Sequence, residues 1–209
     1  PQIRPEEDKI KNDVHQSESL IRLLSRLLFC WFMKEKGLIN PNLFNIDYLR
    51  KILKGFEGIR SEQTIYYKAI LQNLFFATLN KPIDERKIID KGFNKKEYGD
   101  PLVYRYEELF KDDKSVLSHF ENIPFLNGGL FEPGILDYYK PNRLTGLNEN
   151  INTLEIDDQW FINFFEELEK YNFTIDENSV TDVEVSVDPE MLGRIFENLL
   201  AEIDPDSGE

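Results

Sequence analysis

The stretch SLIRLLSRLLFCWFMKEKG, residues 19–37, decides the fold of this chain. Its apolar residues recur every three or four positions, which is the spacing of one face of an α-helix. Gly37 follows the last periodic turn, and glycine commonly ends a helix. The pattern predicts a long core helix from Ser19 to Lys36, with Arg22 and Arg26 on the face opposite the core.

Two further helices are predicted downstream of this one, with short connections. Either Asn45 or Asp47 caps a shorter helix, and Gly55 ends it. Ser61 caps a longer, strongly apolar helix that stops before Pro82, because proline cannot continue a helix. This part of the chain therefore has the pattern of a helical bundle.

The pattern becomes irregular after the third helix. Glycines and mixed charges accumulate between residues 81 and 105, which indicates a surface excursion, and short helices are expected at residues 106–110 and 115–121. A tight structural turn is predicted at Asn127, Gly128 and Gly129, because Asn and Gly tolerate positive φ. An anion cradle is the less favoured reading of this turn, since no basic residue is adjacent.

The last part of the chain predicts a helix, a small hairpin and a final helix. Asp157 and Asp158 cap the first of these helices, and alternating runs at residues 172–175 and 183–187 predict the hairpin. Asp188 followed by Pro189 is an N-cap and first-turn pair for the final helix. We interpret this cap as a packing element rather than a site.

These elements predict a mainly α fold, a helical bundle-like domain with long irregular loops and a small β-hairpin near the C-terminus. We expect a polar leader at residues 1–18, a helical bundle segment at 19–122 and an acidic helical segment at 123–209, the last two packed as one domain. The final helix is followed by only a short polar run. We therefore expect the chain to be an excised fragment of a longer protein.

The net charge of -14 is unevenly distributed along the chain. Residues 1–120 carry 21 Lys and Arg against 18 Asp and Glu, whereas residues 121–209 carry 4 against 21. Only the first part is suited to a phosphate backbone. The single cysteine, Cys30, excludes an internal disulfide, and no membrane-spanning run or signal peptide is evident, so a cytoplasmic location is expected.

Residue types that carry catalysis are sparse and scattered. His15, His119 and Cys30 are isolated in the sequence, so no metal-binding cluster is predicted. Acid-x-Lys triplets such as residues 112–114 lie outside any β-like run, and the glycine-rich phosphate-binding and nucleophile-elbow motifs do not occur. The sequence therefore predicts no catalytic, cofactor-binding or metal-binding residue.

The basic residues of the surface excursion are the candidate contact with nucleic acid, because aromatic residues are interleaved with them. The candidate DNA-backbone contacts are Lys87, Lys91, Lys95, Lys96 and Arg105. A solvated loop of mixed charge is the alternative, and the acidic residues that nearly cancel the basic ones favour it.

Three segments resemble a known family. They are RLLFCWFMKEKGLI (residues 26–39), PFLNGGLFEP (124–133) and YNFTIDENSVTDVEVSVDPEMLGRIFENLLAE (171–202). They resemble the region just upstream of the methyltransferase core in large bacterial type IIG restriction-modification enzymes and in related phage-defence adenine methyltransferases. The block DPEMLGRIFENLLA is the most specific part of the resemblance, which covers the chain from about residue 20 to its end.

The resemblance implies a helical connector that joins an endonuclease to an S-adenosylmethionine-dependent adenine-N6 methyltransferase and positions both on double-stranded DNA. The cofactors expected for the parent are S-adenosylmethionine and Mg, and the family's cofactor and catalytic motifs are not found in this chain. No catalytic residue is therefore carried over. A DNA-backbone clamping module and an unrelated acidic interaction domain are the alternative functions.

Overall fold

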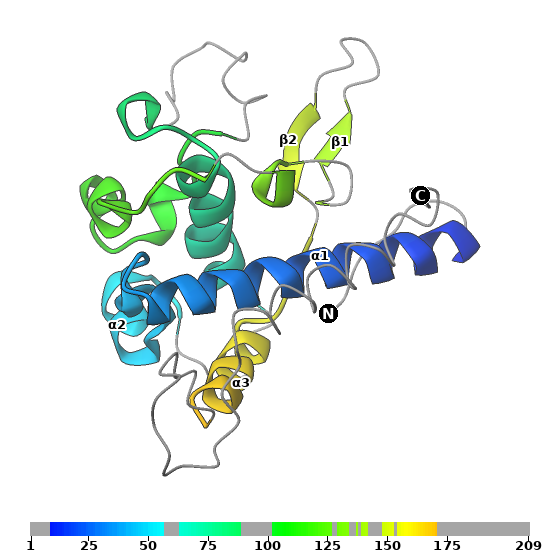
Figure 1. Cartoon of the computed structure of the whole chain (residues 1–209), viewed down its shortest axis with the longest axis horizontal. Coiled ribbons are helices and arrows are strands. Elements are labelled where there is room, and N and C mark those ends of the chain that lie inside the picture. The colour runs from blue at the N-terminus through cyan, green and yellow to red at the C-terminus, as the bar shows by residue number, and fades with distance from the viewer. Residues whose placement is uncertain are drawn as a thin grey trace, which may run out of the picture.

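A computed structural model describes residues 9–56, 63–88, 102–126, 129–133, 137, 139–141, 148–152 and 154–170, and it describes side chains for these residues except 9–16, 139–141 and 148–152. The described part is mainly helical, which confirms the predicted fold class (Figure 1). The α-helices are α1 (Lys9–Glu35), α2 (Ile46–Ile52) and α3 (Asp158–Leu168), and η2 (Tyr67–Leu79) is a π-helix. The 3-10 helices are η1 (Pro41–Phe44), η3 (Ile83–Glu85), η5 (Glu107–Leu109), η6 (Asp113–Ser115), η7 (Leu117–Phe120) and η8 (Gly129–Phe131).

Helix α1 is longer than the sequence pattern predicts. It begins at Lys9 rather than Ser19, so it extends into the segment expected to be a polar leader. Its C-terminal end is as predicted: Gly37 has φ +71°, its N–H donates to the Lys34 carbonyl, and the Leu38 N–H donates to the Met33 carbonyl. This pair of bonds is the Schellman arrangement, which satisfies carbonyls that a helix end leaves without partners.

Helix α2 confirms one of the two predicted caps. The Asn45 Oδ1 accepts a hydrogen bond from the Tyr48 N–H at 2.9 Å, whereas Asp47 lies in the first turn. After the helix, Gly55 has φ +74°, a backbone conformation that glycine adopts without strain.

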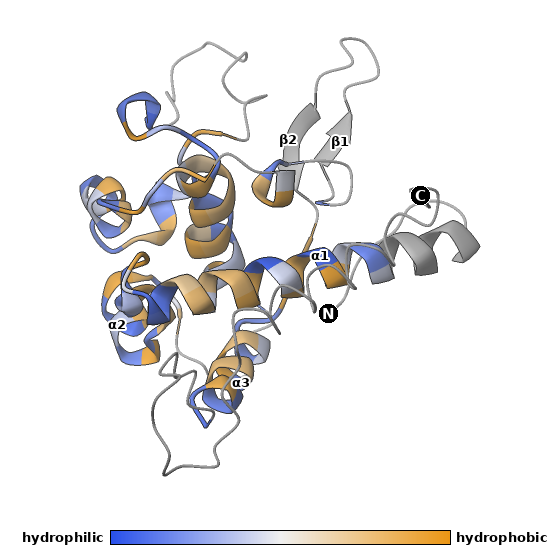
Figure 2. Cartoon of the chain, in the orientation of Figure 1, coloured by the Kyte–Doolittle hydropathy of each residue, from blue (hydrophilic) through white to orange (hydrophobic). Residues whose placement is uncertain are grey.

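The predicted third helix is a buried π-helix. Residues 65 and 66 are α-helical and lead directly into η2. The predicted cap, Ser61, lies outside the described residues. Except for Lys68, every residue of η2 is buried, and Figure 2 shows this helix mostly in the hydrophobic colours. A helix that is apolar on all sides is stable only inside a protein core. The Thr78 Oγ1 bonds back five residues to the Asn73 carbonyl, at the spacing of a π-helix.

Aromatic side chains from α1, η2 and α3 meet in one core. The Trp31 ring stacks on Phe165 at 5.8 Å between centroids, and Tyr66 contacts Phe161 at 5.0 Å and Phe165 at 5.4 Å. Tyr66 is fully buried, and its hydroxyl donates to the Leu43 carbonyl at 3.0 Å. This core cluster includes residues from both sides of the segment boundary expected at residue 122.

The long segment between η2 and α3 contains mainly short 3-10 helices. The predicted helices at 106–110 and 115–121 are present as η5, η6 and η7. Strands β1 (Tyr139–Pro141) and β2 (Asn148–Asn152) form an antiparallel pair before α3. The hairpin predicted at 172–187, the Asp188–Pro189 cap and the final helix lie outside the described residues. No helix in the described part is both long and apolar enough to cross a bilayer.

Candidate functional site

The predicted DNA-contact residues occupy different environments. Lys87 is exposed, whereas Lys91, Lys95 and Lys96 lie outside the described residues. Arg105 is only 8% exposed. Its backbone N–H and carbonyl both pair with the Asn73 side-chain amide, at 2.9 and 2.8 Å. The structure therefore does not bring these basic residues together on one described surface.

Arg86, in the same excursion, has a structural role. Its Nη2 donates to the Thr78 carbonyl and to the Ile123 carbonyl, both at 2.8 Å, and its Nε donates to the Lys81 carbonyl at 3.1 Å. The last carbonyls of a helix have no partner within the helix, so a cation placed there stabilises the helix end. Arg86 closes the C-terminal end of η2 in this way.

A pair of arginines on α1 holds the segment that follows the predicted Asn-Gly-Gly turn; we call this group the arginine clasp. Arg22 Nη2 donates to the Gly129 and Glu132 carbonyls, both at 2.9 Å. Arg26 donates to the Leu130 carbonyl at 2.6 Å and to the Glu132 carbonyl at 3.0 Å. Gly129 begins η8, whereas Asn127 and Gly128 lie outside the described residues.

Asp137 completes the arginine clasp with a buried carboxylate. It forms an ion pair with Arg26 through Nη1, and its Oδ2 accepts from Arg26 Nη2 at 3.3 Å. Arg26 is 1% exposed and Asp137 is 5% exposed. The Arg26 guanidinium also lies 5.6 Å from the Phe75 ring centroid and 5.1 Å from that of Phe76. A buried charge requires such compensation, because desolvation of an unpaired ion costs several kcal/mol.

The arginine clasp corrects the placement expected for its two arginines. Arg26 lies inside the core rather than on the opposite face of α1, and Arg22 is partly buried. Burial lowers the pKa of the Arg22 guanidinium, and the like charge of Arg26 lowers it further. The sequence contains one indication that these arginines are buried: apolar residues flank both of them along α1. The clasp can position a loop, and its one carboxylate, Asp137, is paired with Arg26.

Asp158 is a second buried carboxylate, and it joins α3 to η2. The sequence predicts both Asp157 and Asp158 as caps of α3. The cap is Asp157, whose Oδ1 accepts from the Gln159 N–H at 2.9 Å. Asp158 is 0% exposed, and its Oδ1 accepts from the Tyr66 N–H at 2.8 Å. Burial raises the pKa of Asp158 to about 7, although backbone N–H donors at the start of the η2 helix oppose the shift.

His119 lies at the centre of a third polar group, between α2 and η7. Its Nδ1 lies 3.0 Å from the Tyr48 hydroxyl and its Nε2 lies 3.1 Å from Ser115 Oγ. Ser115 Oγ donates to the Asp112 carbonyl, so it accepts from Nε2–H and the neutral ring receives the Tyr48 proton at Nδ1. Burial lowers the pKa of His119, which favours this neutral form.

Catalytic and metal-binding groups do not converge in the described part of the chain. No group of three or more His, Cys, Asp or Glu side chains could hold a metal ion there. Burial raises the pKa of the Cys30 thiol, so this cysteine stays protonated at neutral pH and is a poor nucleophile. The buried polar groups of the structure are suited to holding segments together.

Comparison with known proteins links the chain to restriction-modification. No protein-family model matches it, and no solved structure is significantly similar to it. The chain is 29% identical over 191 residues, 90% of its length, to a protein of Methanocaldococcus jannaschii named "Putative type II restriction enzyme and methyltransferase RM.MjaORFECS2P". It spans 12% of the length of that relative. The similarity confirms the predicted relationship to restriction-modification enzymes, and it relates this chain to one part of a much longer protein.

Proposed function

We propose that this chain is a helical connector domain of a restriction-modification protein, and that it performs no catalysis alone. In this role it joins an endonuclease to an S-adenosylmethionine-dependent DNA adenine methyltransferase and holds both in a fixed relation on DNA. The observation that carries the proposal is the similarity of 90% of the chain to 12% of a restriction enzyme and methyltransferase. A segment of that size is a domain within such a protein.

The polar groups of the structure support a connecting role. Four buried or partly buried polar side chains each form a hydrogen bond with the backbone of a segment distant in the sequence. They are Arg26, Asn73, Arg86 and Asp158. Such bonds fix how helices and loops are arranged, which a rigid spacer between two enzymes requires. S-Adenosylmethionine and Mg are then cofactors of the parent protein, and no residue of this chain is assigned to either.

The partners that follow from this role are the methyltransferase and endonuclease domains of the same polypeptide, together with double-stranded DNA. The location that follows is the cytoplasm, where the DNA is. Of the predicted DNA contacts within the described residues, only Lys87 is exposed, and Arg105 is buried. A clamp built from those five residues is therefore not favoured as a separate function.

The test uses the native polypeptide that carries this sequence. Arg26→Met breaks the arginine clasp, and Lys36→Met serves as the control because the Lys36 side chain is exposed. We expect Arg26→Met to reduce both DNA cleavage and methyl transfer at least tenfold at a temperature that unfolds the variant domain, and Lys36→Met to retain both. A wild-type polypeptide that shows neither reaction would overturn the proposal.

A further inference from the structure

A pocket of about 260 Å³ lies at the C-terminal end of α2. Its lining consists of Arg50, Leu53, Gly55, Phe56 and Lys111. None of these five residues is acidic, and the two charged ones are both cations. The pocket therefore has the charge of an anion site, although the whole chain carries a net charge of -14.

Backbone pairing brings the two cations together from different parts of the chain. Leu53 and Phe110 form an isolated antiparallel bridge, and the Lys111 N–H donates to the Ile52 carbonyl at 2.8 Å. The end of α2 and the segment after η5 are thereby joined side by side. The positions of Arg50 and Lys111 thus depend on paired backbone rather than on a loose loop.

Hydrogen bonding holds the Lys111 ammonium at the pocket. Its Nζ donates to the Arg50 carbonyl at 2.7 Å, which uses one of its three N–H groups. Arg50 contacts Asp47 through Nη1 at 3.2 Å, with 45% and 81% of the two side chains exposed. Exposed pairs of this kind contribute roughly 0 to 1 kcal/mol, so an incoming anion can replace Asp47.

Gly55 contributes backbone to the lining of the pocket. Its φ is +74°, a conformation that glycine adopts without strain. A Cβ at this position would lie 3.1 Å from Gln63 Oε1 and 3.2 Å from Ile65 Cδ1, so the turn at Gly55 also packs closely against the segment that follows it.

We propose that this pocket binds a phosphate group of a nucleic-acid backbone, with Arg50 and Lys111 as the two cationic contacts. Arginine and lysine are the usual partners of phosphate oxygens. Leu53 and Phe56 are buried and contribute apolar atoms to the lining. The inference rests on the proposed function, which brings the chain to DNA. It places the contact on α2 and the loop after η5 rather than on residues 87–105.

The experiment measures binding of the 209-residue chain to a fluorescein-labelled duplex of about 20 base pairs by anisotropy, from about 50 to 200 mM salt. Each phosphate contact contributes about 0.9 to the slope of log K against log salt, or about 3.5-fold over this range. We expect Arg50→Gln and Lys111→Gln each to weaken binding at least threefold. Because both cations contact the same phosphate, the double variant should reduce the slope by about 0.9.

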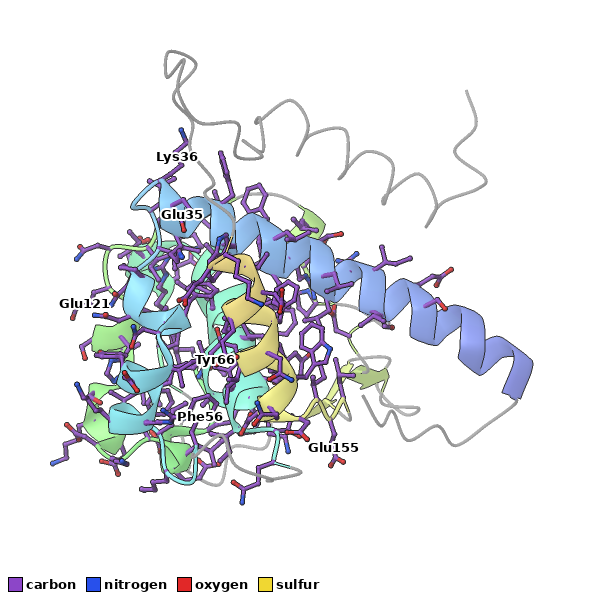
Figure 3. The ribbon with its side chains drawn as sticks, turned by 90° about the horizontal axis from the view of Figure 1, so that it is seen from below. Glu35, Lys36, Phe56, Tyr66, Glu121 and Glu155 are labelled. Carbon is purple, nitrogen blue, oxygen red and sulfur yellow. The ribbon has the colours of Figure 1, made fainter. Side chains whose placement is uncertain are left out.

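Control variants separate this pocket from a general charge effect. Lys111→Arg keeps the charge and should keep the wild-type slope. Lys36→Gln removes an exposed charge next to Gly37, and Figure 3 shows Lys36 well separated from Phe56 of the pocket. This variant should bind within twofold of the wild type. Equal urea midpoints for all variants establish that each one folds.

Three results would overturn the proposal: no salt-sensitive binding at about 50 mM salt by the wild-type chain, an unchanged slope in the double variant, or a slope that falls only when Lys87 is neutralised. The last result would move the contact to the predicted excursion. Methyl transfer by the native polypeptide is a separate readout. Transfer that persists when the chain fails to bind DNA overturns the pocket and leaves the proposed function standing.

Discussion

Replacing Arg26 by methionine tests the arginine clasp directly. Methionine matches the length of the arginine stem, so the change removes the guanidinium with little loss of volume. Asp137, 5% exposed, then loses its closest cation, and the Leu130 carbonyl loses the donor that Arg26 Nε supplies. Arg22 remains, but its Nε lies 3.9 Å from the Asp137 carboxylate.

The expected cost follows from burial on both sides of the ion pair. Removing one partner of a buried pair costs about 3 to 5 kcal/mol, because an uncompensated charge is left inside. With a urea slope of about 2 kcal/mol per M, the unfolding midpoint should fall by about 2 M. The Arg50→Met control removes an exposed pair and should change the free energy of unfolding by less than about 0.5 kcal/mol.

The assay is urea unfolding of the chain and its variants, followed by circular dichroism and tryptophan fluorescence. Arg26→Met combined with Asp137→Leu removes both charges and should recover about 1 to 3 kcal/mol relative to Arg26→Met alone. An Arg26→Met midpoint within about 0.3 M of the wild type, equivalent to roughly 0.6 kcal/mol, would refute the reasoning that this ion pair is buried and structurally required.

Further predictions concern pH and helix ends. Burial raises the pKa of Asp158 from 3.8 to about 7, so the folded state favours the protonated carboxyl. Its contribution to stability is complete below pH 3.8 and is lost as pH rises through about 7, by at most about 4 kcal/mol. Asp158→Asn should remove this loss, which is checked by unfolding the wild type and the variant at pH 4 and pH 8. His119 has the opposite sign: burial lowers its pKa below 6.5, so stability present above that pH is lost as pH falls, and His119→Gln should lose less stability than the wild type between pH 7 and pH 5. Asn73→Leu removes the two hydrogen bonds between the Asn73 side chain and the Arg105 backbone and should cost about 2 to 4 kcal/mol in chemical unfolding, and a cost below about 0.5 kcal/mol would contradict the pairing. Gly37→Ala forces alanine into positive φ and should lower the free energy of unfolding by about 1 kcal/mol, measurable by thermal melting.

Local signals in the sequence predicted the core of α1 and the start of α2. The periodicity of residues 19–37 predicted the core part of α1, Gly37 predicted its end, and Asn45 was one of two caps considered for α2. Each of these features depends on residues within a few positions of one another. The start of α1 at Lys9 was missed because the polar residues there lack a periodic apolar face.

The polar network could not be predicted in the same way, because its partners are distant in the sequence. Arg26 and Asp137 are 111 residues apart, and the period of α1 indicates a face without indicating what covers it. Asp157 and Asp158 are adjacent and chemically alike, so only tertiary contact determines that one caps α3 and the other bonds the Tyr66 N–H. The cationic pocket likewise depends on the bridge between Leu53 and Phe110.

The proposed function makes this chain a non-catalytic domain of a restriction-modification protein. The most direct measurement compares the transfer of radiolabelled methyl groups from S-adenosylmethionine to duplex DNA by the native polypeptide and by the 209-residue chain alone, at equal molar amounts. The account predicts N6-methyladenine formation by the native polypeptide and none above background by the chain. Transfer by the chain alone, or no transfer by the native polypeptide, would contradict it.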